Sequence, residues 1–218
     1  MILNNSGVPS VATFVQVIPQ PDFSVAATPA SRTVPPGTGT SYSVTVTPSN
    51  GFTGNVTFSV AGLPSGANAS FSPSSVTGSG SSTLSVSTSS STPTGSYTLT
   101  IAAKNGSNLT HSTQVTLVVA DFSLSASPST RTVSGNAKTT YTVTTTALGP
   151  FSATVKFSVS GLPARTSASF SPTSVVGSSN TTLTVSTKPR AASGSHPLTI
   201  IATGGGLTHS TIVNLVIQ

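Results

Sequence analysis

The chain has 218 residues, of which 80 are Ser or Thr and only 5% are charged, against roughly 25% in an average soluble protein. It has no cysteine, which excludes disulfides and thiolate metal sites, and its net charge of +6 reflects a near absence of acids rather than a basic patch. The eight basic residues are scattered singly and the apolar residues alternate with hydroxyls, so neither nucleic-acid binding nor insertion into a membrane is expected.

The first predicted element is a β-strand over residues 11–18, within an N-terminal extension that spans residues 1–21. Residues 13–18 have the same pattern as residues 113–118 and 211–216, each of which closes a predicted domain. Residues 1–10 lack the basic and apolar regions of a signal peptide. We therefore expect either that a signal has been removed or that the chain is a piece of a longer protein.

Three interpretations of this strand remain open. It is the severed last strand of an upstream domain, a donor strand that adds to a sheet of a neighbouring subunit, or a flexible leader. An isolated apolar strand should not be ordered in water, so we expect an upstream domain or another copy of the chain to cover it. The residues of this candidate assembly strand are Val11, Thr13, Phe14, Val15, Val17 and Ile18.

The rest of the chain is a tandem repeat of about 99 residues, which predicts one domain over 22–120 and a second over 121–218. Asp22-Phe23-Ser24 recurs at 121–123, Gly62-Leu63-Pro64 at 161–163 and Phe71-Ser72-Pro73 at 170–172. The linkage around Val119 and Ala120 contains no Gly, Pro or Ser spacer. The two domains should therefore form a stiff rod.

Within each repeat the apolar residues have a period of two, as in 41–47, 55–60, 82–87, 97–101 and 115–119, and turn residues separate these runs. No segment has helical periodicity. The pattern predicts an all-β chain in which each domain is an antiparallel β-sandwich of about seven strands. Tyr42, Tyr97 and Tyr141 fall on the inward side of their strands.

The repeated motifs, together with the segment 92–101 and the closing Thr-x-Val-x-Leu-Val strand, resemble tandem bacterial immunoglobulin-like modules, a fold class that includes fibronectin-III-like sandwiches. Such modules occur in secreted and cell-surface proteins. Tyr97 lies where these folds keep a corner tyrosine. The second repeat has His196-Pro197 at this place, so we expect the phenol contact to be lost and the strand to begin later or to lie at an edge.

The sequence offers no catalytic residues, no metal site and no cofactor site. Asp22 and Asp121 are equivalent positions in separate domains, and we interpret each as a turn or linker hydrogen bond at the start of its domain. His111 and His209 also recur, and we place them at the start of the closing strands. Three histidines spread over two domains do not make a zinc site, and two carboxylates do not make a calcium site.

Asn-x-Ser/Thr sequons make six asparagines candidate N-glycosylation sites, namely Asn4, Asn55, Asn68, Asn105, Asn108 and Asn180. The absence of Trp argues against a sugar-binding platform. We therefore expect a non-catalytic extracellular protein at the cell surface, a stiff rod that is a subunit of a fibre or pilus, or the stalk of a larger protein. The alternative is a substrate- or glycan-binding spacer module of a secreted hydrolase.

Overall fold

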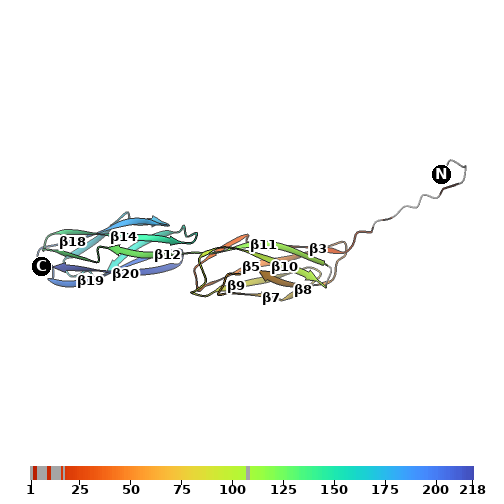
Figure 1. Ribbon diagram of the computed structural model, residues 1–218, viewed down its shortest axis with the longest axis horizontal. Coiled ribbons are helices and arrows are strands. Elements are labelled where there is room, and N and C mark those ends of the chain that lie inside the picture. Colours follow the sequence, from red (N-terminus) through yellow and green to blue (C-terminus); the bar gives the residue numbers. More distant parts are fainter. Residues whose placement is uncertain (1, 4–8, 11–15, 17, 107–108) are drawn as a thin grey trace.

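Two β-sandwiches lie end to end in the structure, a computed structural model that describes residues 2–3, 9–10, 16, 18–106 and 109–218 (Figure 1). Strands β3 to β11 form the first sandwich and strands β12 to β20 form the second. The predicted all-β fold is confirmed, since the described residues contain no helix and hence no helix that could cross a membrane.

Each sandwich consists of a four-stranded and a five-stranded sheet. In the first sandwich the four-stranded sheet has the order β3 (Asp22–Thr28), β5 (Gly39–Ser49), β9 (Gly80–Thr88) and β7 (Ala67–Ser72). The five-stranded sheet has the order β4 (Ser31–Val34), β11 (Leu109–Val119), β10 (Gly95–Asn105), β6 (Asn55–Ala61) and β8 (Ser75–Thr77).

The second sandwich repeats this topology strand for strand. Its four-stranded sheet has the order β12 (Asp121–Ser127), β14 (Lys138–Leu148), β18 (Ser179–Thr187) and β16 (Thr166–Ser171). Its five-stranded sheet has the order β13 (Thr130–Val133), β20 (Leu207–Ile217), β19 (Gly194–Gly204), β15 (Thr154–Ser160) and β17 (Ser174–Val176).

The strand count differs from the predicted seven because two edge strands of each sandwich cross from one sheet to the other. β3 belongs to the four-stranded sheet, and the chain continues as β4 in the five-stranded sheet; β7 and β8 divide in the same way. The crossings lie at the cis peptide bonds Thr28–Pro29 and Ser72–Pro73, which the second sandwich repeats at Ser127–Pro128 and Ser171–Pro172.

The crossing also introduces a parallel pair into sheets that were predicted to be antiparallel. β4 runs parallel to β11, with Ser31 opposite Thr116 and Val34 opposite Val119, and β13 runs parallel to β20 in the second sandwich. The other strand pairs of the described residues are antiparallel. The first part of each domain is thereby paired with its last strand.

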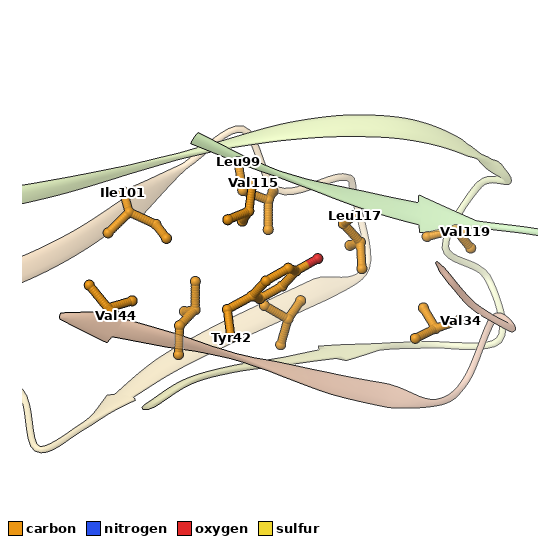
Figure 2. Close-up of a cluster of buried hydrophobic side chains, with 10 residues drawn as sticks. Val34, Tyr42, Val44, Leu99, Ile101, Val115, Leu117 and Val119 are labelled. Atoms are coloured by element: carbon orange, nitrogen blue, oxygen red, sulfur yellow. The ribbon is translucent and has the colours of Figure 1, made fainter. Parts of the chain in front are cut away.

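The hydrophobic core lies between the two sheets, as the period-two pattern requires. In β5 the inward residues Tyr42, Val44 and Val46 are buried, while the Ser and Thr residues between them face outward. Leu99, Ile101, Val115 and Leu117 meet them from β10 and β11 (Figure 2). Removing such side chains from water contributes about 1.5–3 kcal/mol each.

The inward tyrosines also join the two sheets by hydrogen bonds. The Tyr42 hydroxyl donates to the carbonyl of Thr116 at 2.8 Å, and that of Tyr141 donates to the carbonyl of Asn214 at 2.7 Å. Burial raises the pKa of both phenols, which keeps them protonated and able to donate. The predicted inward orientation of Tyr42 and Tyr141 is confirmed.

A corner contact is present in both sandwiches, although the phenol is lost at His196, as expected. The Tyr97 hydroxyl donates to the carbonyl of Pro93, four residues upstream, at 2.8 Å. In the second sandwich His196 Nε2 lies 2.9 Å from the carbonyl of Ala192, also four residues upstream. An imidazole N–H therefore takes the place of the phenol.

The expectation that Pro197 delays its strand or moves it to an edge is wrong. β19 begins at Gly194 and lies between β20 and β15. Pro197 faces Asn214, whose N–H points away from β19 and donates to the carbonyl of Ser129 at 2.8 Å. Facing residues in an antiparallel ladder point their N–H groups either both inward or both outward, so the missing N–H of Pro197 would also have pointed away from β20.

The glycine of the repeated Gly-Leu-Pro motif is required for steric reasons. Gly62 has a φ of +90°, and a Cβ at this position would collide with the carbonyl oxygen of Thr98. Gly161 has a φ of +86°, and a Cβ there would collide with the carbonyl oxygen of Pro197. Glycine is therefore required where the chain passes over the start of the neighbouring strand.

The predicted N-terminal strand lies mostly outside the described residues. Within 11–18 only Gln16 and Ile18 are described, and neither belongs to a strand. The Ile18 side chain is 72% exposed. Two short strands not predicted from the sequence, β1 (Ile2–Leu3) and β2 (Pro9–Ser10), pair with each other further upstream.

Because the two hydrophobic cores are equivalent, shortening an equivalent side chain in either core should destabilise its own sandwich by a similar amount. Leu99 and Leu198 are equivalent side chains with no exposed surface. We expect Leu99→Ala to destabilise the first sandwich by about 2–5 kcal/mol and to leave the second unchanged, because the cavity forms in one core only. Chemical denaturation should resolve two transitions, with Leu198→Ala as the control that shifts the other one. A single transition that moves with either variant would contradict independent cores.

Candidate functional site

The two aspartates and two of the three histidines of the chain meet as pairs. Asp22 is the first residue of β3, and His111 is the third residue of β11, in the opposite sheet. Asp121 and His209 occupy the same places in β12 and β20. Each pair lies at the pole where the chain enters its sandwich, so it joins the first strand of the domain to the last.

In the first sandwich the pair is built on an aromatic support. His111 Nε2 donates to Asp22 Oδ1 at 2.7 Å, and the same oxygen accepts the backbone N–H of Phe23 at 2.7 Å. The edge of one ring meets the face of the other between Phe23 and His111, whose ring centroids are 4.8 Å apart. Phe52 packs on Phe23 with a centroid separation of 5.0 Å.

The second sandwich reproduces this geometry closely. His209 Nε2 lies 2.8 Å from Asp121 Oδ1, which accepts the N–H of Phe122 at 2.6 Å. Phe122 lies 4.6 Å from the His209 ring and 5.0 Å from Phe151. The Asp121 side chain is 21% exposed, compared with 44% for Asp22, because Asp121 lies at the joint between the sandwiches.

The hydrogen bond from His111 lowers the pKa of the Asp22 carboxyl below its ordinary value of 3.8, and the N–H of Phe23 lowers it further. Both donors stabilise the ionised carboxylate. Each Asp accepts a hydrogen bond at the start of its domain, as interpreted, but it is the first residue of a strand rather than part of a turn or linker. The predicted position of the histidines near the start of the closing strands is confirmed.

This arrangement ties the first strand of each sandwich to the last. One nitrogen of each imidazole is engaged by a carboxylate, and the ring packs against a buried phenylalanine. Among residues 18–106 and 109–218, no three His, Asp, Glu or Cys side chains gather as metal ligands. The pair can hold two strands together and can respond to pH.

The joint between the sandwiches is a single residue. Ala120 separates the end of β11 from the start of β12; it is 3% exposed and donates its N–H to the carbonyl of Val34 at 3.1 Å. Beside it, Gly149 has a φ of +65° and packs so tightly that a Cβ there would lie 2.8 Å from the Cβ of Thr94. The two sandwiches therefore touch each other beside the linker as well as being joined by it.

Two cavities of the described residues bear on function. One, of about 190 Å³, lies at the joint between Val34 and Pro35 of the first sandwich and Phe151 and Ala153 of the second. The other, of about 370 Å³, is a hollow in the outer face of the four-stranded sheet of the first sandwich. Uncharged polar side chains line this hollow, among them Asn68, Ser70, Ser85 and Ser87.

The candidate glycosylation sites fall in different environments. Asn55, Asn68 and Asn180 are exposed, whereas Asn105 is half-buried and donates its Nδ2–H to the carbonyl of Asn55 at 2.7 Å. Asn4 and Asn108 lie outside the described residues. Of the candidate assembly strand, Val11, Thr13, Phe14, Val15 and Val17 also lie outside them.

Sequence reasoning found the residues of the Asp–His pairs but did not join them. The pairing spans 89 residues in one sandwich and 88 in the other, and no local pattern encodes it. The available signal was that Asp and His recur together in both repeats of a chain that has no other acidic residue.

No protein-family model matches the sequence, and no curated protein matches it. Among solved structures the chain is similar to domains 4 and 5 of the S-layer protein SbsC, with 21% identity over 55% of this chain and 64% of that chain and a TM-score of 0.35. It is similar to the C-terminal domain of the Streptococcus agalactiae AgI/II polypeptide BspA, with 11% identity over 90% and 100% of the two chains and a TM-score of 0.45.

An endo-fucoidan hydrolase of glycoside hydrolase family 107 is similar over 89% of this chain and 29% of that chain, with 10% identity and a TM-score of 0.34. All three TM-scores are below 0.5. The function proposed below therefore rests on the geometry of this chain.

The Asp22–His111 pair predicts an acid-side dependence of stability. Because the folded-state pKa of Asp22 is lowered, its stabilising contribution is full above the unfolded pKa and is lost as the pH falls through the folded pKa. We expect the Asp22 carboxyl to titrate below 3.8 by NMR, and His111→Ala to raise that midpoint. His209→Ala is the control and should leave it unchanged. An unaltered midpoint in His111→Ala would show that the hydrogen bond is absent in solution.

Proposed function

We propose that this chain is a non-catalytic structural module of the cell surface, a stiff spacer that holds apart whatever lies at its two ends. The observation that carries the proposal is the path of the chain. The chain enters each sandwich at one pole and leaves it at the opposite pole (Figure 1). The first sandwich is entered at its outer pole, and the second is left at its outer pole (Figure 1). In this arrangement the full length of each domain contributes to the distance between the two ends of the rod.

The joint supports the same function. A single buried residue links the sandwiches, and the contact of Gly149 with Thr94 restricts bending at that point. Flexible spacers use Gly- and Ser-rich linkers, which allow domains to reorient. The chain is rich in Ser and Gly, yet places neither between Val119 and Asp121.

The outer faces of the sheets fit an extracellular role. In the four-stranded sheets Ser and Thr face one another across neighbouring strands, as in Ser41 opposite Ser85 and Thr142 opposite Thr182. Such faces are hydrated without charge, and the scarcity of Lys and Arg leaves few sites for trypsin-like proteases. The absence of cysteine makes the fold independent of the redox state of its surroundings.

Two forms of this function follow from the N-terminal extension. In the first, the chain is a fibre subunit and residues 11–18 of one copy add to a sheet of the next. β7 offers a suitable edge, since it is the last strand of its sheet and no described residue pairs with its outer side. In the second form the chain is the stalk of a larger protein, and residues 11–18 close an upstream sandwich.

The hollow in the first sandwich favours a second candidate function, that of a glycan-binding spacer module of a secreted hydrolase. Position 39, at the rim, is glycine, and the equivalent position in the second sandwich is Lys138. Retention of the chain on an insoluble polysaccharide, lost in Gly39→Lys, would favour this candidate.

The spacer function predicts an extended particle. Two 11-residue strands in line, at about 3.4 Å per residue, give a rod of about 75 Å. We expect small-angle X-ray scattering of the full chain to give a radius of gyration of about 23 Å or more, whereas a compact chain of this length would give about 17 Å. A value near that of a compact chain would exclude a spacer.

Strand donation predicts concentration-dependent fibres. We expect electron microscopy of the full chain at increasing concentration to show filaments that are lost on deletion of residues 1–20, because the deletion removes the donor strand. The matched control is Phe14→Asp with Val17→Asp, which keeps the segment but removes its apolar character. Monodisperse particles at every concentration would exclude the fibre form and leave the stalk.

A further inference from the structure

The terminal strands of each sandwich are placed to carry tension along the rod. A pull on the N-terminal side reaches the first sandwich at Asp22, the start of β3, and a pull on the C-terminal side reaches it at Val119, the end of β11. Both strands run from the outer pole towards the joint. Axial force therefore drives β3 and β11 in opposite directions along their own axes.

Force along a strand axis is resisted by its whole hydrogen-bond ladder, because the bonds of a sheet lie across the strands and are loaded together. β11 is held by eleven residue pairs to β10 and by four to the parallel strand β4. Among the described residues β3 is held on one side only, by seven pairs to β5. β3 is thus the weaker of the two loaded strands, and any tie at its first residue protects the whole ladder.

The Asp22–His111 pair is such a tie. Asp22 is pulled outward with β3 and His111 is pulled towards the joint with β11, so the 2.7 Å hydrogen bond between them joins two groups that the load moves apart. Phe23 lies between the sheets, 2% exposed, with its ring against His111. Asp121, His209 and Phe122 repeat the arrangement in the second sandwich.

We propose that the Asp22–His111 and Asp121–His209 pairs are mechanical locks, which hold the first strand of each sandwich to the last when the rod is pulled from its ends. The inference rests on the spacer function, and it adds that the spacer resists a force that pulls on its two ends. The lock requires one donor on the imidazole and one carboxylate acceptor, and both sandwiches carry it although the chain has only two acidic residues.

Single-molecule force spectroscopy tests the locks with the full chain held by its two termini. We expect two unfolding events, and we expect His111→Ala to raise the unfolding rate of one of them at a fixed force by about threefold to tenfold, the change that loss of one hydrogen bond produces. His209→Ala should act on the other event. His196→Ala is the matched control, because its imidazole contacts Ala192 within the turn before β19 and joins no terminal strands.

A second pulling direction separates a lock from a general loss of stability. The chain has no cysteine, so Ser43→Cys in β5 and Ser70→Cys in β7 provide the only thiols for attachment. Force between them acts on β5, β9 and β7 and spares β3. We expect His111→Ala to have no effect in this direction. An equal effect in both directions would overturn the lock and leave a merely stabilising pair.

Conservative variants keep the test decisive if alanine prevents folding. His111→Gln retains an N–H donor near Nε2, and Asp22→Asn retains an acceptor for Phe23 but removes the charge. We expect His111→Gln to keep most of the resistance and Asp22→Asn to lose part of it. Unchanged axial rates in all of these variants would overturn the locks, and the spacer function would still stand on the scattering result.

Discussion

Each strand of this protein can bury only one of its two faces, and nearly every other structural feature depends on that constraint. Alternating Val, Leu, Ile and Tyr side chains turn inward from both sheets, while Ser and Thr turn outward. With almost no charged residues available, the apolar layer between the sheets must supply most of the stabilisation. The outward hydroxyls remain hydrated, and neighbouring strands can carry them without repulsion.

The constraint also explains how the ends of each domain are secured. A strand paired on one side only is a weak point, and β3 is such a strand within the part of the chain that the structure describes. The chain crosses to the other sheet after β3, and β4 pairs in parallel with the closing strand β11, so the second strand of the domain is fixed to the last. The Asp–His pair adds a polar tie where the chain enters, on a base of packed aromatic rings.

Two kinds of structural feature could be predicted from the sequence: those encoded by the period-two alternation of apolar residues and those encoded by the 99-residue repeat. The alternation in 41–47 places Tyr42 and Val44 in the core, and the 99-residue offset gives two equivalent sandwiches. Features that depend on contacts across the fold were not predicted. The parallel pairing of β4 with β11 and the Asp22–His111 bond join residues about 85–90 positions apart, which no local pattern records.

Local substitutions were misjudged for a related reason. His196 lacks the phenol of Tyr97, as expected, yet its ring makes an equivalent contact with the carbonyl of Ala192 that was not predicted. Pro197 was expected to make its strand begin later or lie at an edge, yet its nitrogen faces away from β20 and the pairing of β19 with β20 continues through it. In both cases the outcome depends on the direction of one group in the folded chain, and residue type alone does not specify it.

The central claim is that the two sandwiches form one stiff axis whose ends are far apart. The most direct test is the distance between spin labels placed at the two poles, through Thr53→Cys in the outer loop of the first sandwich and Gln218→Cys at the end of the second. Pulsed electron paramagnetic resonance should give a single narrow distribution near 75 Å, about two 11-residue strands in line. A broad distribution, or one centred below about 50 Å, would contradict the account, because the sandwiches would then bend or fold back on each other.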